Sequence, residues 1–168
     1  KNDSITLPTP TKTGSTFAGW YTNSECTESA GNAGASYTPT KDITLYAKWD
    51  TNKYTLTINP NGGTWNNSTD VQEYEQDYGT IKEIPNPTVA PKGYTITFNT
   101  NGGSAVASQT STKSFTNWAL SGAGSISGTT FTFGAGNTTL TANYKNDAMT
   151  LPTPTRTGYT FVGWYTDS

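Results

Sequence analysis

Five carboxylates gather in one stretch of the sequence, and they are the residues that could most readily do chemistry. They are Asp70, Glu73, Glu75, Asp77 and Glu83. Clustered carboxylate oxygens are the ligands that Ca²⁺ prefers, and a carboxylate pair cleaves glycosidic bonds in most glycosidases. The stretch lacks the Asp-x-Asp-x-Asp spacing and the following Gly of a calcium loop. We therefore interpret it as the solvated face of a loop or strand, and we predict neither a catalytic nor a metal site.

Aromatic side chains are the second candidates, because indole and phenol rings can stack on sugars. The alternative is that they anchor a small core, where aromatics supply much of the buried area. A Phe-x-x-Trp step recurs at Phe17/Trp20, Phe115/Trp118 and Phe161/Trp164, and this recurrence favours the core. Tyr21 and Tyr46 are predicted to face solvent. Together with Tyr165, they are the candidates for contact with a ligand or with a neighbouring repeat.

Other reactive groups are scarce. The chain has no His and one Cys, so the commonest general base and metal ligand is missing and an internal disulfide cannot form. Lys48 or Lys53 could form an isopeptide bond with Asn143, although an unmodified strand ladder is the simpler alternative. The segments LPTPT at 7–11 and 151–155 resemble a sortase signal only superficially, because Pro occupies the fourth position.

Composition excludes further classes of function. The 10 basic and 12 acidic residues give a net charge of -2, which is unlike the clustered Lys and Arg of a nucleic-acid-binding protein. No stretch approaches the ~20 apolar residues of a membrane span. Aromatics make up 12% and charged residues 13% of the chain, whereas disordered chains are rich in charge and poor in aromatics. We predict a folded protein that is not an enzyme, has no cofactor, and neither binds nucleic acid nor inserts into a membrane through this segment.

An internal repeat is the main signal in the sequence. Residues 1–24 return as residues 145–168 without a gap, so the offset is 145 − 1 = 144, and only positions 4, 5, 12, 15, 18 and 23 differ. Shorter echoes lie within this period: YTLTINPNGG at 54–63 matches YTITFNTNGG at 94–103, and TLYAKW at 44–49 matches TLTANY at 139–144. We expect each copy of a block to fold in the same way.

The echoes divide the chain into four predicted segments. Residues 1–50 are the C-terminal part of a repeat unit that begins upstream, and residues 53–92 are an opening half-unit with an Asn-Gly-Gly hairpin. Residues 93–144 form a second, Gly- and Ser-rich unit, and residues 145–168 start the next period. Because the chain begins and ends at the same phase of the repeat, we expect it to be a window from a longer array.

The local pattern predicts short strands and tight turns. Apolar residues alternate with polar ones at 43–49, 54–58, 94–98 and 140–144, as in antiparallel sheets with one wet face. The Asn-Gly pairs at 61–62 and 101–102 favour tight hairpins. Pro-containing segments at 7–10 and 151–154 should be edges or connectors. Residues 68–77 and 24–30 are weak helix candidates.

The motifs GSTFAGWYTN at 14–23, YTPTKDITLYAKW at 37–49 and GYTFVGWYTDS at 158–168 resemble the Listeria–Bacteroides repeat, which is related to the B-repeats of bacterial internalins. The resemblance implies β-grasp-like (ubiquitin-like) modules in tandem, within secreted or wall-attached bacterial proteins. It brings no catalytic residues. The middle block departs from the pattern, because Asn117 replaces Gly and no LPTPTRTG lead-in stands between residues 103 and 115.

The function predicted from these observations is structural. We expect the repeats to form a stalk or filament scaffold of an extracellular or cell-surface bacterial protein, and to contact neighbouring repeats of the same chain or identical chains in a fibre. The alternative is an adhesive module that recognises a host glycan or receptor through exposed aromatic residues.

Overall fold

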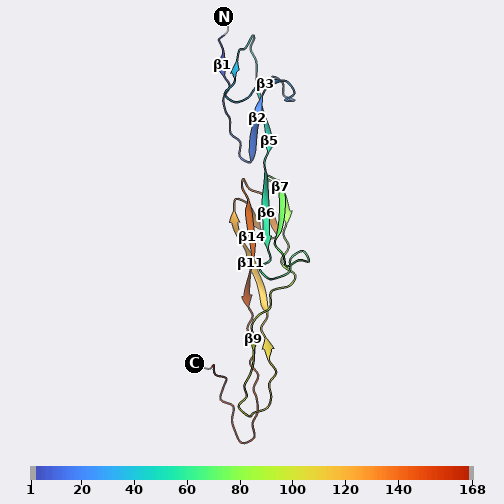
Figure 1. Cartoon of the computed structure of the whole chain (residues 1–168), viewed down its shortest axis with the longest axis vertical. Helices are drawn as coiled ribbons and strands as arrows, with labels where there is room; N and C mark the ends of the chain where they lie inside the picture. Colours follow the sequence, from blue (N-terminus) through green and yellow to red (C-terminus); the bar gives the residue numbers. More distant parts are fainter. Residues whose placement is uncertain (1–2, 167–168) are drawn as a thin grey trace. The chain divides into compact units, whose positions relative to one another are not determined.

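The computed structural model describes residues 3–166 and contains strands, turns and loops but no helix over this range (Figure 1). The predicted mainly β fold class is therefore confirmed. The chain divides into two compact units. Unit 1 comprises residues 1–59, 71–85 and 120–140, and unit 2 comprises residues 60–70, 86–119 and 141–168.

The first part of unit 1 is a three-stranded sheet in the order β3-β2-β5. Its strands are β2 (Ser15–Tyr21), β3 (Ser29–Gly31) and β5 (Tyr46–Thr51), with β2 antiparallel to both neighbours. Two short strands, β1 (Ile5–Thr6) and β4 (Ser36–Tyr37), pair beside it. The predicted alternation over 43–49 is confirmed from residue 45 onward, where half-buried and exposed residues alternate.

A single residue, Asn52, joins this sheet to the next one. Its backbone N–H donates to the carbonyl of Gly14 at 2.9 Å, and its own carbonyl accepts from the N–H of Tyr78 at 2.9 Å. Its side-chain oxygen accepts from the Thr16 hydroxyl at 2.6 Å. Because these bonds leave little backbone polarity unpaired at the junction, β5 can pass directly into β6 (Lys53–Asn59).

A four-stranded sheet follows in the order β11-β14-β6-β7. The strands are β7 (Gln72–Asp77), β11 (Lys113–Gly122) and β14 (Thr138–Asn146) beside β6, and parts of β11 and β14 fall in each unit. A small sheet in the order β12-β13-β8 contains β8 (Ile81–Glu83), β12 (Ser125–Ser127) and β13 (Thr130–Thr132). The fully buried core side chains of unit 1 around these strands are Leu56, Ile58, Ile84, Phe131 and Leu140.

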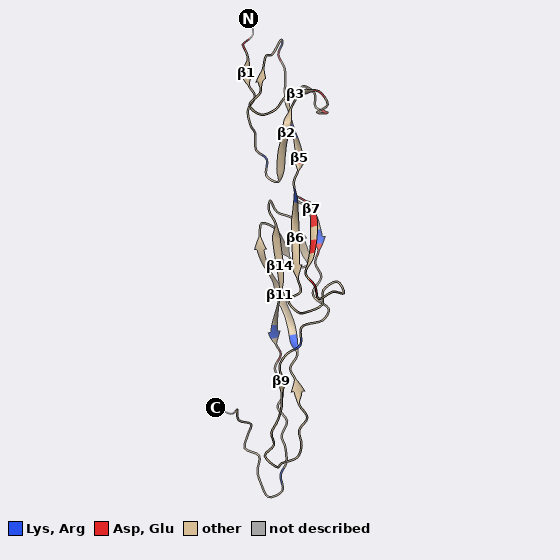
Figure 2. Cartoon of the chain, in the orientation of Figure 1, with Lys and Arg blue, Asp and Glu red and all other residues tan. Residues whose placement is uncertain are grey.

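The acidic stretch falls largely on β7, where Figure 2 shows the concentration of carboxylates. Glu73, Glu75 and Asp77 are exposed there, whereas Tyr74 between them is half-buried. The Glu73 carboxylate accepts a hydrogen bond from the Thr57 hydroxyl at 3.4 Å across the strand pair. Within residues 3–166, no three His, Cys, Asp or Glu side chains form a group that could hold a metal.

Both Asn-Gly pairs form turns with the positive φ values that the sequence predicts, but the tight hairpins predicted with them are not formed. Asn61 and Gly62 have φ of 51° and 82°, and Asn101 and Gly102 have φ of 47° and 84°, the positive values of a type I′ turn. The chain after each turn does not fold back as a tight hairpin. Instead the amide of Thr64 donates to Val89 O at 2.7 Å, because β6 is already paired with β14 and β7.

The second copy of the Asn-Gly-Gly segment lies in unit 2 and carries only a short strand. β9 (Thr95–Ile96) pairs with β10 (Gln109–Thr110), although the sequence predicts the same alternating strand as at 54–58. Tyr94 is exposed instead of packing inward. The two segments have different neighbours: β6 is flanked by β14 and β7, whereas among residues 3–166 β9 pairs only with β10.

Neither helix candidate is helical. Residues 72–77 form β7, residues 24–28 form a turn and a short loop, and residues 29–30 belong to β3. Cross-strand pairing with β6 and β2 provides these segments with hydrogen bonds that an isolated short helix would lack. No helix that could cross a bilayer is found among residues 3–166.

Candidate functional site

The first Phe-x-x-Trp block is shaped by a β-bulge. Residues three apart in a regular strand point to opposite faces, but the register of β2 against β5 shifts between Phe17 and Gly19, so the intervening residue is extra. Phe17 and Trp20 therefore share a face, with ring centroids 5.5 Å apart and an interplanar angle of 62°. The Trp20 indole N–H donates to Pro8 O at 2.9 Å, which ties the ring pair to the Pro-rich lead-in.

The last block has the same local geometry 144 residues later. Phe161 and Trp164 lie 5.4 Å apart at 63°, and the Trp164 indole donates to Pro152 O at 2.7 Å. The turns before the two blocks also match, because the amide at 15 donates to the carbonyl at 12, and the amide at 159 to the carbonyl at 156, both at 3.1 Å. The ring pair, the turn and the indole bond are thus the same in the two copies, but the strand formed by residues 15–21 does not form at 160–166, so the expectation that copies fold alike holds only for this local geometry.

The middle block, on β11, keeps the ring pair but lacks the lead-in. Phe115 and Trp118 lie 5.5 Å apart at 60°, and Tyr144 on β14 meets Phe115 edge-on at 6.0 Å. Trp118 is buried and its indole N–H has no hydrogen-bond partner among the described residues. The missing lead-in seen in the sequence explains this, since Pro carbonyls of the lead-ins accept the other two indoles.

The first and last blocks differ in what covers them. Trp49 of β5 lies 5.4 Å from Phe17, edge to face, and β3 and β5 flank β2. Residues 160–166 form no strand, and Val162 and Tyr165 are 81% and 82% exposed. Within residues 3–166, the last block therefore has no strand paired beside it as β5 is beside β2, and its aromatic face is left partly open.

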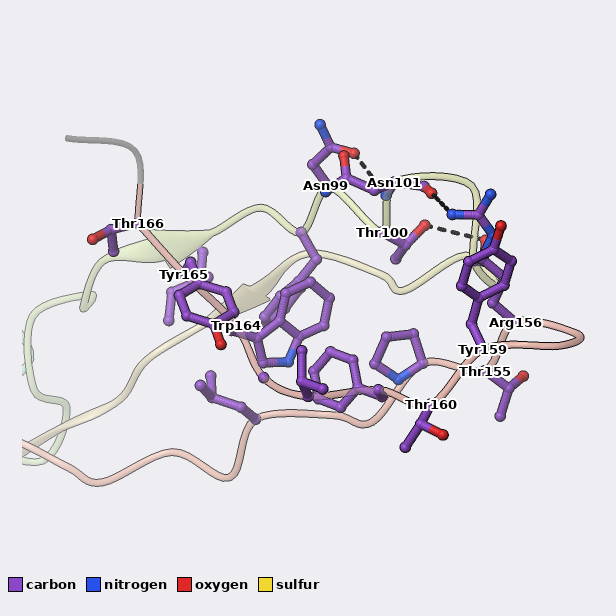
Figure 3. Close-up of a pocket in the computed structure, with 18 of the residues that line it drawn as sticks. Asn99, Thr100, Asn101, Thr155, Arg156, Tyr159, Thr160, Trp164, Tyr165 and Thr166 are labelled. Carbon is purple, nitrogen blue, oxygen red and sulfur yellow. Dashed lines mark hydrogen bonds between the residues drawn. The ribbon is translucent and has the colours of Figure 1, made fainter.

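This open face lines a cleft of about 850 Å³ in unit 2 (Figure 3). The opposite wall is the Asn-Gly-Gly segment, from which Phe98 packs against Trp164 with ring centroids 4.8 Å apart. Arg156 donates from Nη1 to Asn101 O at 2.9 Å, and its guanidinium lies 4.1 Å from the Tyr159 ring centroid. The cleft thus combines ring faces with hydroxyl and amide groups, which belong to Thr97, Asn99, Thr100, Thr155 and Thr160.

Comparison with known proteins identifies the repeats. The model of the Listeria–Bacteroides repeat domain matches residues 1–48, 94–134 and 129–168. The chain belongs to the Listeria–Bacteroides repeat family. The three matches contain the first, middle and last Phe-x-x-Trp blocks, respectively, so the family pattern and the ring pairs coincide.

Two similar proteins come from Evansella cellulosilytica, and their names describe them as membrane proteins, one of them Gly-rich. They are 40% and 36% identical to this chain over 84 and 85 residues, which is 49% and 50% of the chain. The aligned region spans 12% and 9% of their lengths. No solved structure matches the chain.

The three tyrosines predicted from the sequence fall at two repeats. Tyr21 and Tyr46 are opposite each other on β2 and β5, and the Lys48 ammonium lies 5.3 Å from the Tyr21 ring centroid. Tyr21 is half-buried and Tyr46 is 40% exposed. Tyr165, the repeat equivalent of Tyr21, lies in the cleft beside Trp164 (Figure 3). Their role in binding stays a prediction.

Sequence reasoning missed the cleft residues Phe98, Arg156 and Tyr159. A signal for two of them was present, because positions 156 and 159 correspond to Lys12 and Ser15, where the two copies of the repeat differ. The substitutions add a guanidinium and a ring where the last block meets the Asn-Gly-Gly segment. No comparable signal pointed to Phe98.

The proposed isopeptide partners have other contacts in the structure. Lys48 lies over the Tyr21 ring, Lys53 is opposite Asp77 in the β6–β7 pair, and the Asn143 amide donates to Asn117 Oδ1 at 3.4 Å. Cys26 is a free, half-buried cysteine whose thiol donates a weak hydrogen bond to Ser24 O at 3.8 Å.

Two ionisable groups in unit 2 have perturbed pKa values. Hydrogen bonds from the hydroxyls of Ser114 and Thr112, both 2.7 Å long, lower the pKa of the Asp147 carboxyl. Burial raises the pKa of the Tyr144 phenol, which donates to Pro60 O at 2.9 Å. The Asp147 carboxylate connects the end of β14 to residues 112–114, and the Tyr144 phenol connects β14 to Pro60. Among the described residues, neither group faces a cluster of catalytic side chains.

Proposed function

We propose that this segment is a spacer in a bacterial cell-surface or extracellular protein, in which tandem Listeria–Bacteroides repeats form a stalk or filament scaffold. The observation that carries the proposal is the recurrence of one self-contained block. The same ring pair, turn and indole-to-carbonyl bond recur after 144 residues. A block that fixes its own geometry can be repeated without remodelling its neighbours, which is how repeat proteins extend.

The chemistry of the described residues supports a structural role over an enzymatic one. The carboxylates of the acidic stretch engage neighbouring hydroxyls: Glu73 accepts from Thr57, and Glu83 accepts from Thr129 and Thr130 at 3.0 Å. These contacts are those of a hydrated strand surface. The names of the two relatives as membrane proteins agree with a surface location. In this proposal, the partners are neighbouring repeats of the same chain or identical chains in a fibre.

The β-grasp-like module implied by the family resemblance belongs to the same proposal. The antiparallel strand pairs of unit 1 support this assignment. An experimental structure of the 168-residue chain at atomic resolution tests this assignment.

Small-angle scattering tests the spacer function. The 168-residue chain is compared with polypeptides that carry one or two further 144-residue periods. A spacer predicts that the maximum dimension rises by a constant increment with each period. A maximum dimension that grows only as the cube root of the mass would contradict it, because the repeats would then collapse into a globule.

A second candidate function is adhesion through a glycan, and the open cleft is the specific observation that favours it. Aromatic faces beside hydroxyl and amide groups match the apolar and polar surfaces of a sugar ring. Glycan-array binding by the 168-residue chain, lost on Tyr165→Ala and retained on Tyr21→Ala, would support adhesion through the cleft. Loss on Tyr21→Ala or Tyr46→Ala would instead place the binding surface on β2 and β5.

A further inference from the structure

We infer that Asn101 is a site of spontaneous deamidation, and that Asn61, which stands in the other copy of the same motif, is protected from it. The motif is Asn-Gly-Gly, preceded by Pro at 60–63 and by Thr at 100–103. Asn is a chemically labile residue, and a following Gly has no side chain to shield its backbone amide. The inference does not depend on the spacer function.

The reaction needs only water. The backbone nitrogen of Gly102 loses its proton and attacks Cγ of Asn101, so that an N–Cγ bond forms. The Cγ–Nδ2 bond breaks, and Nδ2 leaves as ammonia together with the proton that Gly102 lost. Water then opens the resulting succinimide ring at either carbonyl, which gives aspartate or isoaspartate. The product carries a new negative charge, and isoaspartate adds a methylene group to the main chain.

The side chain of Asn61 is held away from this attack. Its Nδ2 donates to Ala142 O at 3.0 Å. The turn begins directly after strand β6, which is paired on both sides, and it contains the buried Gly63. The Tyr144 hydroxyl donates to Pro60 O at 2.9 Å. Deamidation here would therefore have to break the side-chain bond and also open a turn that two residues of β14 hold.

The side chain of Asn101 lacks such a restraint. It is exposed, and its amide makes no hydrogen bond among residues 3–166. The turn is held through the main chain, because Gly103 N–H donates to Thr100 O at 3.0 Å and Arg156 Nη1 donates to Asn101 O at 2.9 Å (Figure 3). Residues 97–100 before it form no strand. Segments outside paired strands open locally at low free energy, so we expect this turn to open more often.

Arg156 provides the contact that we expect to limit the rate. Attack by Gly102 requires rotation of the backbone between its nitrogen and Cα of Asn101. That rotation moves the Asn101 carbonyl away from the guanidinium, so each reactive opening must break this hydrogen bond. Phe98, which contacts Trp164, lies three positions before Asn101 (101 − 98). Deamidation would thus add charge to this wall of the cleft as the protein ages.

Peptide mapping by mass spectrometry, with chromatographic separation of aspartate and isoaspartate, tests the inference on the folded 168-residue chain in mildly alkaline buffer. We expect Asn101 to react at least about tenfold faster than Asn61, because local opening free energies differ widely within one native structure. In denaturing urea the two rates should become nearly equal, because the motif is shared. Equal rates in the folded chain, or a faster rate at Asn61, overturn the inference.

Matched variants remove one restraining contact from each turn. Arg156→Met should speed the reaction at Asn101 about fivefold, which is the factor that corresponds to one lost hydrogen bond, and leave Asn61 unchanged. Tyr144→Phe should do the reverse, because the turn at Asn61 loses its bond to Pro60 O. An unchanged or slower rate at Asn101 in Arg156→Met contradicts the restraining role of Arg156.

A polypeptide that carries one further 144-residue period tests whether the reaction depends on the end of the chain. It contains a second copy of each turn and moves the C-terminus away from the first. We expect the same preference for residue 101 over residue 61 in both copies. Deamidation confined to the copy nearer the C-terminus would tie the reaction to the chain end and overturn the inference.

Discussion

The three Phe-x-x-Trp blocks have different neighbours within residues 3–166. The first has both a lead-in and a paired closing strand, and the middle one has a closing strand but no lead-in. The last has a lead-in, and no strand pairs with it in the described part of the chain. Their Phe–Trp centroid distances are nevertheless 5.5, 5.5 and 5.4 Å, with angles of 62°, 60° and 63°. The ring pair is thus a property of the block itself.

The two accessory elements do different things. The lead-in supplies the carbonyl that accepts the indole N–H, and the middle block, which lacks it, leaves the Trp118 N–H unpaired among residues 3–166. The closing strand supplies the ladder and the outer aromatic ring, which is Trp49 in the first block and Tyr144 in the middle one. A block without a paired closing strand keeps the geometry of its ring pair, but its side chains are more exposed to solvent.

The largest expected difference comes from removing the Phe ring of a covered and of an open block. Phe17 contacts two indoles, Trp20 and Trp49, whereas Phe161 is 38% exposed and contacts Trp164. We expect Phe17→Ala to lower the free energy of opening of β2 by about 2–3 kcal/mol, below the 3–5 kcal/mol typical of fully buried Phe, and Phe161→Ala to cost about 1 kcal/mol. Exchange of the β2 backbone amides measures the first cost, and exchange of the hydrogen-bonded Trp164 indole N–H measures the second. If Phe17→Ala and Phe161→Ala cost the same free energy, the closing strand does not stabilise the ring pair, and this account is wrong.

Replacing each Trp by benzothienylalanine, which exchanges the indole N–H for sulfur at nearly constant volume, tests the lead-in. At Trp20 and Trp164 the change removes a hydrogen bond and should cost about 1 kcal/mol. At Trp118 it removes a buried, unpaired N–H and should be neutral or stabilising. Chemical denaturation of the three variants gives the comparison. A loss at Trp118 as large as at Trp20 would mean that its N–H is paired.

The closing residue of the middle block can be tested by pH. Tyr144→Phe should cost about 1 kcal/mol, because the phenol no longer donates to Pro60 O. Burial raises the pKa of Tyr144, so folding favours the neutral phenol. Its contribution is complete below the usual phenol pKa of about 10 and is lost as the pH rises through the folded value. Chemical denaturation at pH 7 and pH 11 measures the free energy of unfolding of the wild type and of Tyr144→Phe. The difference between the two proteins should be smaller at pH 11, and an equal difference at both pH values would contradict this account.

The smallest expected effect concerns the cation that β5 places over the first block. Lys48→Met keeps the aliphatic length but removes the charge above Tyr21. We expect a loss of about 0.5 kcal/mol, as for exposed cation–π pairs. The free energies of unfolding of the wild type and Lys48→Met are compared at increasing salt concentration. If the loss is electrostatic, added salt should reduce the stability difference between the two proteins. A difference that does not depend on salt would indicate lost packing instead.

Part of this architecture could be read from the sequence. The recurrence of Phe-x-x-Trp predicted equivalent blocks, and the Asn-Gly pairs predicted turns with positive φ. The alternation at 54–58 and 140–144 predicted which residues are buried. These features are encoded within a few neighbouring residues, and at these positions the tertiary contacts agree with the local pattern.

The remainder depends on partners distant in sequence. Phe17 and Trp20 share a face only because β2 shifts register against β5. Similar segments at 54–63 and 94–103 give a seven-residue and a two-residue strand, because their neighbours differ. For the cleft, exposed Tyr165 was a sequence candidate, but the contact of Phe98 with Trp164 joins residues 66 positions apart (164 − 98). Local patterns contain no information about such pairings.

The central claim is that a block fixes its own ring pair and that a closing strand adds the ladder. Hydrogen exchange followed by NMR on the unmodified 168-residue chain tests it most directly, because the exchange rates of the two copies are measured in the same sample. The account predicts slowly exchanging indole N–H groups at both Trp20 and Trp164, protected backbone amides at 15–21 and rapidly exchanging amides at 160–165. Equal backbone protection in the two copies, or a Trp164 indole that exchanges as if free, would contradict it.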